Sequence, residues 1–239
     1  AYDDYDFARV VASVQNFCSN EMGALYLDVT KDRLYTMQAG SHGRRSAQTA
    51  MYAIVQVLVR ALAPVLSFTA EEIWQHIPGA PSTSVFLAGN AELEALLPAQ
   101  GAYLQADDAL MQQLLAMREA VSKVLEPMRA EGKIGAALQA EVTVYADGID
   151  LSAYPGIADE FRFLFITSAL DIRPLAVADP AAVAVEGSQV KILARASEYM
   201  KCVRCWHYVE SVGQDPHDPE LCERCIGNVN GGGEMRRYF

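Results

Sequence analysis

Four of the five cysteines in this 239-residue chain lie near its end in two matching pairs, Cys202-Val-Arg-Cys205 and Cys222-Glu-Arg-Cys225. Two residues between a pair of cysteines form a turn that directs both sulfurs toward one point. The sixteen residues between the pairs suit a four-thiolate zinc site. Four thiolates fill a tetrahedral ion and leave no position for water or substrate, so we predict one structural Zn²⁺ bound by all four cysteines.

Other interpretations of the cysteines are weaker. Two disulfides would need an oxidising compartment, whereas this clustering suits a reducing one, so we predict a cytoplasmic protein. A redox CxxC pair usually occurs once and beside a βαβ pattern. His207 and His217 lie within the cysteine-rich segment and could each replace a thiolate, although four cysteines already suffice. Cys18 falls on the apolar stripe of an expected helix and is predicted to lie in the core.

Cations and one aromatic side chain surround the cysteines. The bases of an RNA loop stack on aromatic or guanidinium planes, and phosphates pair with Lys or Arg. The candidate RNA contacts are Arg204, Trp206, Arg224, Arg236 and Arg237 near the metal, and Arg44 and Arg45 between two expected helices. Alternatively, these charges form a solvated rim and Trp206 packs against the zinc loops. Lys31 and Arg33 are expected to pair with Asp28 and Asp32.

The composition limits the classes of protein. With 51% hydrophobic residues the chain can bury a core, and no apolar run reaches the ~18 residues of a membrane-spanning helix. The net charge of −11 means that any nucleic-acid contact must be local. The first residues lack an initiator Met and a signal-peptide layout, so we expect a piece of a longer protein. No P-loop, nucleophile elbow or zinc-protease motif is present, and we predict no active site.

Apolar residues recur at helical spacing along four stretches. The pattern predicts helices over about 5–26, 44–63 and 69–77, and from Asp107 or Asp108 to about 128. Pro64 should kink or end the second helix near Ala63, and Thr69 with Glu72 should form a capping box at the third. Residues 31–43 and 79–106 are polar or rich in Gly and Pro, and we expect loops there.

The pattern then changes to short β-branched runs. Strands are expected over 141–146, 163–170, 182–186 and 190–196, with a short helix over 158–163. We therefore predict a mainly α protein in three parts. These are a helical bundle (1–135), a small α/β unit (136–197) and a four-cysteine zinc knuckle (198–239).

Two stretches of the chain carry a family resemblance that gives the bundle its type. FCSNEMGALYLDVTKDRLYT, followed by RRSAQTAMYAIVQVLVRALAPVLSFTAEEIWQHIPG, is similar to the anticodon-binding helical domain of class I aminoacyl-tRNA synthetases of the isoleucyl, valyl and leucyl group. KCVRCWHYVESVG and LCERCIGNV resemble the C-terminal zinc knuckle of bacterial-type isoleucyl-tRNA synthetases. The tail is the more specific half, because the valyl enzymes that share the bundle typically end in a coiled coil.

The resemblance implies a C-terminal fragment that binds the anticodon arm of tRNA(Ile) as a monomer, without membrane or DNA partners. It also implies that Cys202, Cys205, Cys222 and Cys225 hold the Zn²⁺. In that family, isoleucine activation with ATP belongs to a Rossmann domain with HIGH and KMSKS signatures, and editing belongs to an inserted domain. Neither is present in this sequence, so the fragment should be inactive alone.

Two other classes compete with this interpretation. A zinc-stabilised protein-interaction module without RNA binding would suit the acidic balance. The knuckle spacing is also similar to that of the zinc finger in formamidopyrimidine-DNA glycosylases, but those enzymes begin with a catalytic Pro-Glu and this chain begins Ala1-Tyr2. Binding to cognate and non-cognate tRNA over a range of salt separates the interaction module from an RNA-binding protein.

Overall fold

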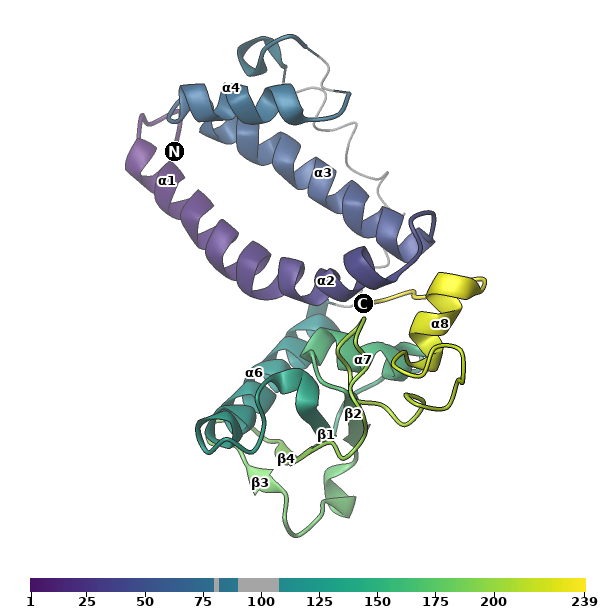
Figure 1. The fold of residues 1–239 in the computed structure, drawn as a ribbon. Helices are drawn as coiled ribbons and strands as arrows, with labels where there is room; N and C mark the ends of the chain where they lie inside the picture. Colours follow the sequence, from purple (N-terminus) through teal and green to yellow (C-terminus); the bar gives the residue numbers. More distant parts are fainter. Residues whose placement is uncertain (80–81, 90–107) are drawn as a thin grey trace. The chain divides into compact units, whose positions relative to one another are not determined.

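The computed structural model describes residues 1–79, 82–89 and 108–239 (Figure 1). Backbone contacts divide the chain into two compact units. Unit 1 takes Ala1–Thr30 and Arg45–Leu104, and unit 2 takes Lys31–Arg44 and Gln105–Phe239. The described residues are mainly helical and include one four-stranded sheet, as the sequence predicts. Residues 31–44, called the connector below, therefore belong with the C-terminal part of the chain.

Unit 1 is built from helices. α1 (Phe7–Asn16) continues into the π-helix η1 (Phe17–Leu27), α3 spans His42–Leu62, α4 spans Ser67–His76, and a 3-10 turn, η2, covers Val85–Leu87. The Tyr2 hydroxyl donates to the Ala61 carbonyl. The Tyr26 hydroxyl donates to the Ala47 carbonyl at 3.2 Å, so the first helical run is joined to α3 near both ends. The core that packs α3, α4 and η2 together contains Val59, Ala63, Ala70, Trp74, Ile77 and Val85.

The ends of α3 and α4 test two predictions. α3 ends at Leu62, just before Pro64, which confirms that proline stops this helix. The predicted capping box is wrong, because α4 begins at Ser67 and the position before it, Leu66, offers no polar side chain. Glu71, and not Glu72, makes the hydrogen bonds near this end of α4. Its carboxylate accepts from the Ser84 hydroxyl at 2.8 Å and from the Val85 N–H at 3.0 Å. It ties α4 to the η2 turn.

The π-helix η1 corrects the prediction for Cys18. Its side chain is exposed and not part of the core. An α-helical stripe assumes 3.6 residues per turn, whereas a π-helix closes i→i+5 hydrogen bonds in a wider turn. The apolar positions that follow Asn16 therefore rotate away from the face that α1 buries with Val10.

A helix also replaces much of the loop expected over 31–43. α2 spans Asp28–Thr36 and continues directly from η1. The Thr30 hydroxyl donates to the Tyr26 carbonyl at 2.7 Å, and the Thr36 hydroxyl donates to the Asp32 carbonyl at 2.8 Å. Both threonines thereby bond back along the helix and satisfy their own polar groups. The polar composition of this stretch predicts a loop. α2 packs through polar side chains, so it lacks the apolar stripe by which an amphipathic helix is recognised in a sequence.

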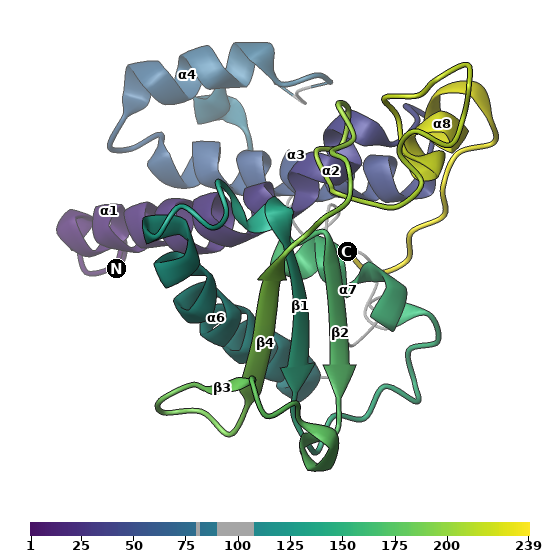
Figure 2. The same cartoon turned by 60° about the horizontal axis from the view of Figure 1, so that its bottom comes forward.

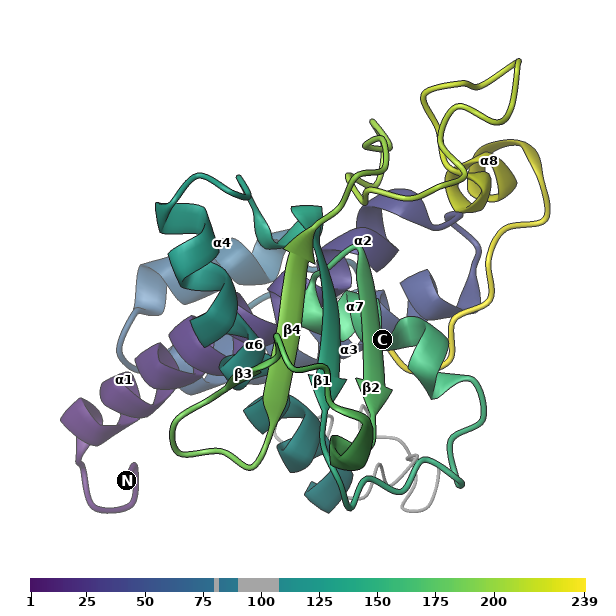
Figure 3. The ribbon, with the colours of Figure 1, turned by 90° about the horizontal axis from the view of Figure 1, so that it is seen from below.

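Unit 2 contains the sheet, whose strands follow the order β2-β1-β4-β3 (Figure 3). The strands are β1 (Ala140–Tyr145), β2 (Ala169–Arg173), β3 (Val183–Ala184) and β4 (Lys191–Ala196). β1 pairs with β2 in parallel and with β4 antiparallel, and β3 pairs with β4 antiparallel. The parallel pair is connected through α7 (Ile157–Phe165), so β1, α7 and β2 form a βαβ unit.

Two helices cover one face of this sheet (Figure 2). α6 (Asp108–Ala130) contacts β1, β4 and α7, and α7 contacts β2. The expected helix from residue 107 or 108 is thus confirmed from Asp108 onward, and Asp107 lies outside the described residues, as do 80–81 and 90–106 of the expected connection. The sequence groups this helix with the earlier ones in a bundle, whereas α6 contacts the sheet and belongs to unit 2. The boundaries at 135 and 197 stay predictions.

Two of the four predicted strands agree closely with the structure, and the other two differ from it. Those over 141–146 and 190–196 match β1 and β4 closely, and the one over 182–186 shrinks to Val183–Ala184. The strand over 163–170 is wrong except for its last two residues, because α7 runs to Phe165, Ile166 takes a left-handed conformation, and β2 begins only at Ala169. Short 3-10 turns cover Ala137–Gln139 (η3) and Leu175–Val177 (η4). Among the described residues, we find no helix with the length and apolar content to cross a membrane.

Candidate metal centre and nucleic-acid interface

The four cysteines of the tail meet at one buried point. Their sulfurs all lie within 4.8 Å of one another, and the Cys205 and Cys222 sulfurs are 3.7 Å apart. A disulfide would need about 2.05 Å. Four sulfurs at ~2.3 Å from a tetrahedral ion lie about 3.8 Å from one another, so this cluster fits one Zn²⁺ with no open position. The fit agrees with the sequence prediction.

Two local structures direct the sulfurs. The first pair lies on a hairpin in which the Cys202 N–H donates to the His207 carbonyl and the Trp206 N–H donates to the Cys202 carbonyl, both at 2.9 Å. The second pair opens α8 (Glu223–Asn230), with Cys222 at the N-cap position. The Cys222 N–H also reaches the Cys202 sulfur at 3.4 Å. Each pair is therefore fixed by backbone hydrogen bonds around the ion.

The crowding of the sulfurs affects their protons. Hydrogen bonding to Cys202, together with contacts to Cys222 and burial, raises the pKa of the Cys205 thiol to about 12. Four thiolates at this spacing repel one another strongly unless a cation lies between them. A bound divalent metal supplies that charge and replaces the thiol protons.

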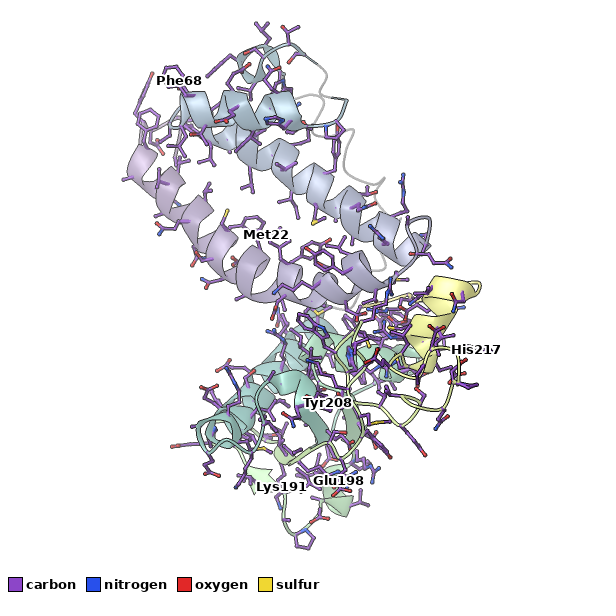
Figure 4. The ribbon with its side chains drawn as sticks, viewed as in Figure 1. Met22, Phe68, Lys191, Glu198, Tyr208 and His217 are labelled. Carbon is purple, nitrogen blue, oxygen red and sulfur yellow. The ribbon has the colours of Figure 1, made fainter. Side chains whose placement is uncertain are left out.

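Neither histidine of the tail joins the four sulfurs. His207 is buried, its Nδ1 lies 3.2 Å from the Cys205 carbonyl, and its ring packs edge-on against Phe163 at 5.6 Å between centroids. His217 is exposed in the loop between the two cysteine pairs (Figure 4). The described cluster of metal-binding groups contains the cysteines alone.

Arg224 and Arg236 lie inside unit 2. Their side chains are 12% and 1% exposed. Arg224 bonds both oxygens of Asp32 at 2.8 Å and reaches Glu234 at 2.8 Å, and Arg236 pairs with the same two carboxylates. Both guanidinium groups lie over the Phe163 ring, at 5.1 and 3.5 Å from its centroid. The pairing and burial oppose the prediction that these two residues contact RNA.

The pKa of Asp32 reports the strength of this cluster. Burial raises the pKa of its carboxyl, but the charge and hydrogen bond of Arg224 and the charge of Arg236 outweigh burial and hold the pKa well below its usual range. For Glu234, too, burial raises the pKa and the two arginines lower it further. Both carboxylates therefore stay ionised inside unit 2.

Arg204 and Arg44 each bond backbone carbonyls of the connector. Arg204, which is half-buried, donates to the Thr36 carbonyl at 2.5 Å and to the Tyr35 carbonyl at 3.5 Å. These carbonyls end α2, where a positive charge is favourable. Arg44, also half-buried, donates to the Met37 carbonyl at 3.2 Å. Each guanidinium group thus spends some of its hydrogen-bond donors on backbone carbonyls of unit 2.

Trp206, Arg45 and Arg237 present their side chains to solvent. Trp206 is 59% exposed, and the Lys201 ammonium lies 5.2 Å from its ring centroid. Arg45 and Arg237 are exposed, and the backbone N–H of Arg237 donates to Glu160 at 2.8 Å. Trp206 is therefore not buried by the zinc loops.

Comparison with known proteins gives the family. Residues 1–144 match the anticodon-binding domain of tRNA ligases. The chain belongs to this family. Residues 201–227 match a zinc finger found in FPG and IleRS, which agrees with the four-sulfur cluster and supports one structural zinc ion. The family membership favours tRNA binding over the alternative of an interaction module.

Relatives of this anticodon-binding chain match its full length. Over 239 residues it is 50% identical to the isoleucine–tRNA ligase of Xanthomonas campestris pv. campestris (strain 8004). It is 49% identical to the isoleucine–tRNA ligases of Xanthomonas axonopodis pv. citri (strain 306) and Stenotrophomonas maltophilia (strain K279a). In each case it covers 24% of the relative, so the chain spans about a quarter of the length of the curated relatives it matches.

Sequence reasoning missed several residues that organise this anticodon-binding chain. The sequence predicts local cations as partners of Asp32, and the structure gives it a distant one, Arg224, which is 192 positions away. Glu160 accepts backbone N–H groups from the last three residues of the chain and was not singled out. No local spacing brings these partners together. The sequence offers one signal of these distant contacts, the Arg that precedes the second cysteine of each pair. This repeat shows that both metal-binding turns carry a cation.

Proposed function

We propose that this chain is the tRNA-binding part of an isoleucine–tRNA ligase and binds the anticodon arm of tRNA(Ile). The match to such ligases over all 239 residues of the chain supports this proposal. The parent enzyme would activate isoleucine with ATP and charge the tRNA in the cytoplasm. The chain itself would carry neither the catalytic nor the editing domain and would be an inactive monomer when isolated. Within it we propose a helical bundle, an α/β unit that includes α6, and a zinc knuckle over 198–239.

The observation that carries the RNA-binding role is the conformation of Trp206. Its φ is +67°, in the left-handed region that bulky residues avoid. Such a conformation disfavours a residue with a Cβ by about 1–2 kcal/mol, and glycine would adopt it without that strain. The chain nonetheless places a largely exposed tryptophan there, at the rim of the metal site. Strain held beside an exposed aromatic ring indicates that the ring has a function.

The chemistry around Trp206 suits an unpaired RNA base. Its exposed ring is a stacking surface, and the nearby Lys201 ammonium can pair with a phosphate. Arg45 and Arg237 are the exposed members of the predicted arginine set, and we retain them as phosphate contacts. Arg44 and Arg204 remain weaker candidates because carbonyls use part of their guanidinium groups. For Arg224 and Arg236 we propose a structural role.

Binding of an anticodon stem-loop RNA from tRNA(Ile) tests the function. Trp206→Ala should weaken binding by about 1–3 kcal/mol, the contribution of one stacked base, and Trp206→Phe should retain most of it. Trp206→Gly should weaken binding equally without lowering the melting temperature, because it relieves the strained backbone. Phe68→Ala is the matched control, since Phe68 is 93% exposed on α4 of the other unit (Figure 4). Unchanged binding by Trp206→Ala, measured with zinc bound, would refute the role of this ring.

A further inference from the structure

We propose that Tyr35 of α2 stacks on a second unpaired base of the bound RNA, and that Arg204 and Arg224 position it by holding α2 against the zinc knuckle. This inference rests on the proposed RNA-binding function and extends the binding face from the knuckle to the connector. The ligand class is single-stranded RNA with unstacked bases. Tyr35 is a binding residue in this proposal, and the two arginines are positioning residues.

The two arginines occupy equivalent places in the two metal-binding turns. Each precedes the second cysteine of its pair, in Cys-Val-Arg-Cys and Cys-Glu-Arg-Cys. Arg224 binds the Asp32 carboxylate through two nitrogens, at 2.8 Å each. Arg204 bonds the carbonyls of Tyr35 and Thr36, four positions further along the helix. The knuckle therefore holds α2 at two points one turn apart.

Further contacts close this side of the connector. The Thr36 hydroxyl accepts from Arg224 at 3.2 Å, and Thr36 and Met37 are buried. The Gln38 side-chain amide donates to the Gly231 carbonyl at 2.8 Å, just after α8. The paired carboxylate and guanidinium of Asp32 and Arg224 are only 15% and 12% exposed. A bidentate pair with so little exposure fixes geometry as well as charge.

Tyr35 is the exposed aromatic residue of α2. Its side chain is 75% exposed, which places a second large aromatic ring at the surface of unit 2. The carbonyl of Tyr35 is bonded by Arg204, which lies two residues before Trp206 in the chain. Arg204 therefore ties the helix that carries Tyr35 to the turn that carries Trp206. Exposed aromatic rings provide the stacking surfaces that hold bases of single-stranded RNA.

Charge selects RNA as the occupant of this face. The connector contains three basic residues, Lys31, Arg33 and Arg44, and one acidic residue, Asp32. The only acidic side chain of the connector is turned toward Arg224 and away from solvent. In a chain with a net charge of −11, the connector therefore carries two more positive than negative charges, together with one exposed aromatic ring. That combination recognises a polyanion with accessible bases.

The first test compares Tyr35→Ala and Tyr35→Phe in the 239-residue chain with zinc bound, using the anticodon stem-loop RNA. Loss of the ring should weaken binding by about 5- to 100-fold, as for one stacked base, and the phenylalanine variant should stay within about 2-fold of the unchanged chain. Phe68→Ala again serves as the exposed aromatic control. Quenching of Trp206 fluorescence at saturating RNA should persist in Tyr35→Ala.

The outcomes separate this inference from the function on which it rests. If Trp206→Ala weakens binding and Tyr35→Ala does not, the inference about Tyr35 is wrong and the RNA-binding function stands. If neither variant weakens binding, the stacking roles of both rings are wrong, whereas failure of the RNA-binding function itself would appear as no binding by the unchanged chain. If Tyr35→Phe loses as much affinity as Tyr35→Ala, the hydroxyl and not the ring plane carries the interaction, and stacking is wrong.

The second test addresses the positioning arginines. Arg224→Lys keeps the charge and loses the bidentate geometry, so amide hydrogen exchange over 32–36 should accelerate while one zinc per chain is retained. In this background Tyr35→Ala should lose most of its effect on RNA affinity, because the ring is no longer held in place. Additive effects of the two substitutions, or unchanged exchange, would overturn the positioning role. Zinc removal with a chelator should accelerate the same amides in the unchanged chain.

Discussion

The guanidinium group of Arg236 is almost completely enclosed, and this one side chain shows how burial decides the role of a cation. It lies 3.5 Å from the Phe163 ring centroid and pairs with Asp32 and Glu234. Arg237, the next residue, is exposed. Adjacent arginines in the sequence thus have opposite roles, one in the interior of unit 2 and one available to a phosphate. Residue type and position in the chain could not separate them.

Arg236→Met should destabilise unit 2 by about 3 kcal/mol, because it leaves two buried carboxylates short of a partner while keeping similar volume. The matched control is Arg129→Met on α6, where the arginine is 52% exposed and its partner Glu126 is 71% exposed. Such a surface pair contributes little to stability. Denaturant unfolding with zinc bound measures both variants, and equal effects at the two sites would contradict the role of the Arg236 pairs.

The lowered pKa of Asp32 makes the stability of unit 2 dependent on pH. A carboxyl whose pKa is lower in the folded than in the unfolded state stabilises the fold above its unfolded pKa, about 3.9, and loses that contribution as pH falls below it. Asp32→Asn should therefore be clearly less stable than the unchanged chain at neutral pH. The difference should narrow between about pH 5 and pH 3. A difference that stays constant over this range would show that ionisation of Asp32 is not the cause.

At the scale of helices and strands, the sequence predicts what local rules determine. Pro64 ends α3, and the apolar stripes give α3, α4 and α6 close to their observed bounds. Local rules fail where distant contacts decide. The polar stretch of α2 is helical, and its Asp32 side is held by the knuckle, a partner 192 positions away. The apolar run FLFITSAL splits between α7 and β2, since β-branched and aromatic residues suit either a buried helix or a strand.

In the candidate site, too, the sequence predicts the features that depend on local spacing and misses those that depend on distant contacts. The metal ligands could be predicted because the turn and spacing are local, and the four sulfurs do meet. The RNA face could not, because exposure depends on which carboxylates fold back onto which arginines. Trp206 was a candidate from its type and place, whereas its strained backbone became visible only in the fold.

The C-terminal segment is held to α7 by one carboxylate. Glu160, in the first turn of α7, accepts the backbone N–H groups of Arg237, Tyr238 and Phe239 at 2.8–2.9 Å. Phe239 then packs beside Phe161, with ring centroids 6.4 Å apart. Since Arg237 and Arg236 both lie in this segment, its attachment fixes one buried and one exposed cation together.

Glu160→Gln should release this segment. A glutamine offers one oxygen and an NH₂ group that cannot accept, so at least one buried N–H loses its partner at about 1–3 kcal/mol. We expect faster hydrogen exchange of the amides of residues 237–239 and lower stability of unit 2. Glu126→Gln, a change on the exposed side of α6, is the control and should alter neither. Unchanged protection of the three amides would contradict the role of Glu160.

For the whole molecule, the net charge of −11 restricts how the chain can bind RNA. Two of the seven predicted arginine and tryptophan contacts, Arg224 and Arg236, neutralise carboxylates inside unit 2. The exposed cations that we propose to meet the RNA are few: Lys31, Lys201 and Arg237 in unit 2, and Arg45 in unit 1. Each phosphate contact contributes about 0.7 to 0.9 to the slope of log affinity against log salt. Binding should therefore show a shallow slope of no more than about 4 in magnitude.

Salt titration of anticodon stem-loop binding measures this slope directly. Arg237→Ala should reduce it by about 0.7 to 0.9 and weaken binding to cognate and non-cognate stem-loops alike, because a phosphate contact carries no base identity. Trp206→Ala should weaken binding with the slope unchanged, because stacking releases no counterions. Arg173→Ala on β2, whose exposed side chain pairs with Asp171, should change neither quantity. A slope much steeper than about 5 would exceed the contribution of these four cations together with the half-buried Arg44 and Arg204. It would mean that Arg224 and Arg236 open to the RNA, and the buried cluster would then change on binding and would not be a fixed support.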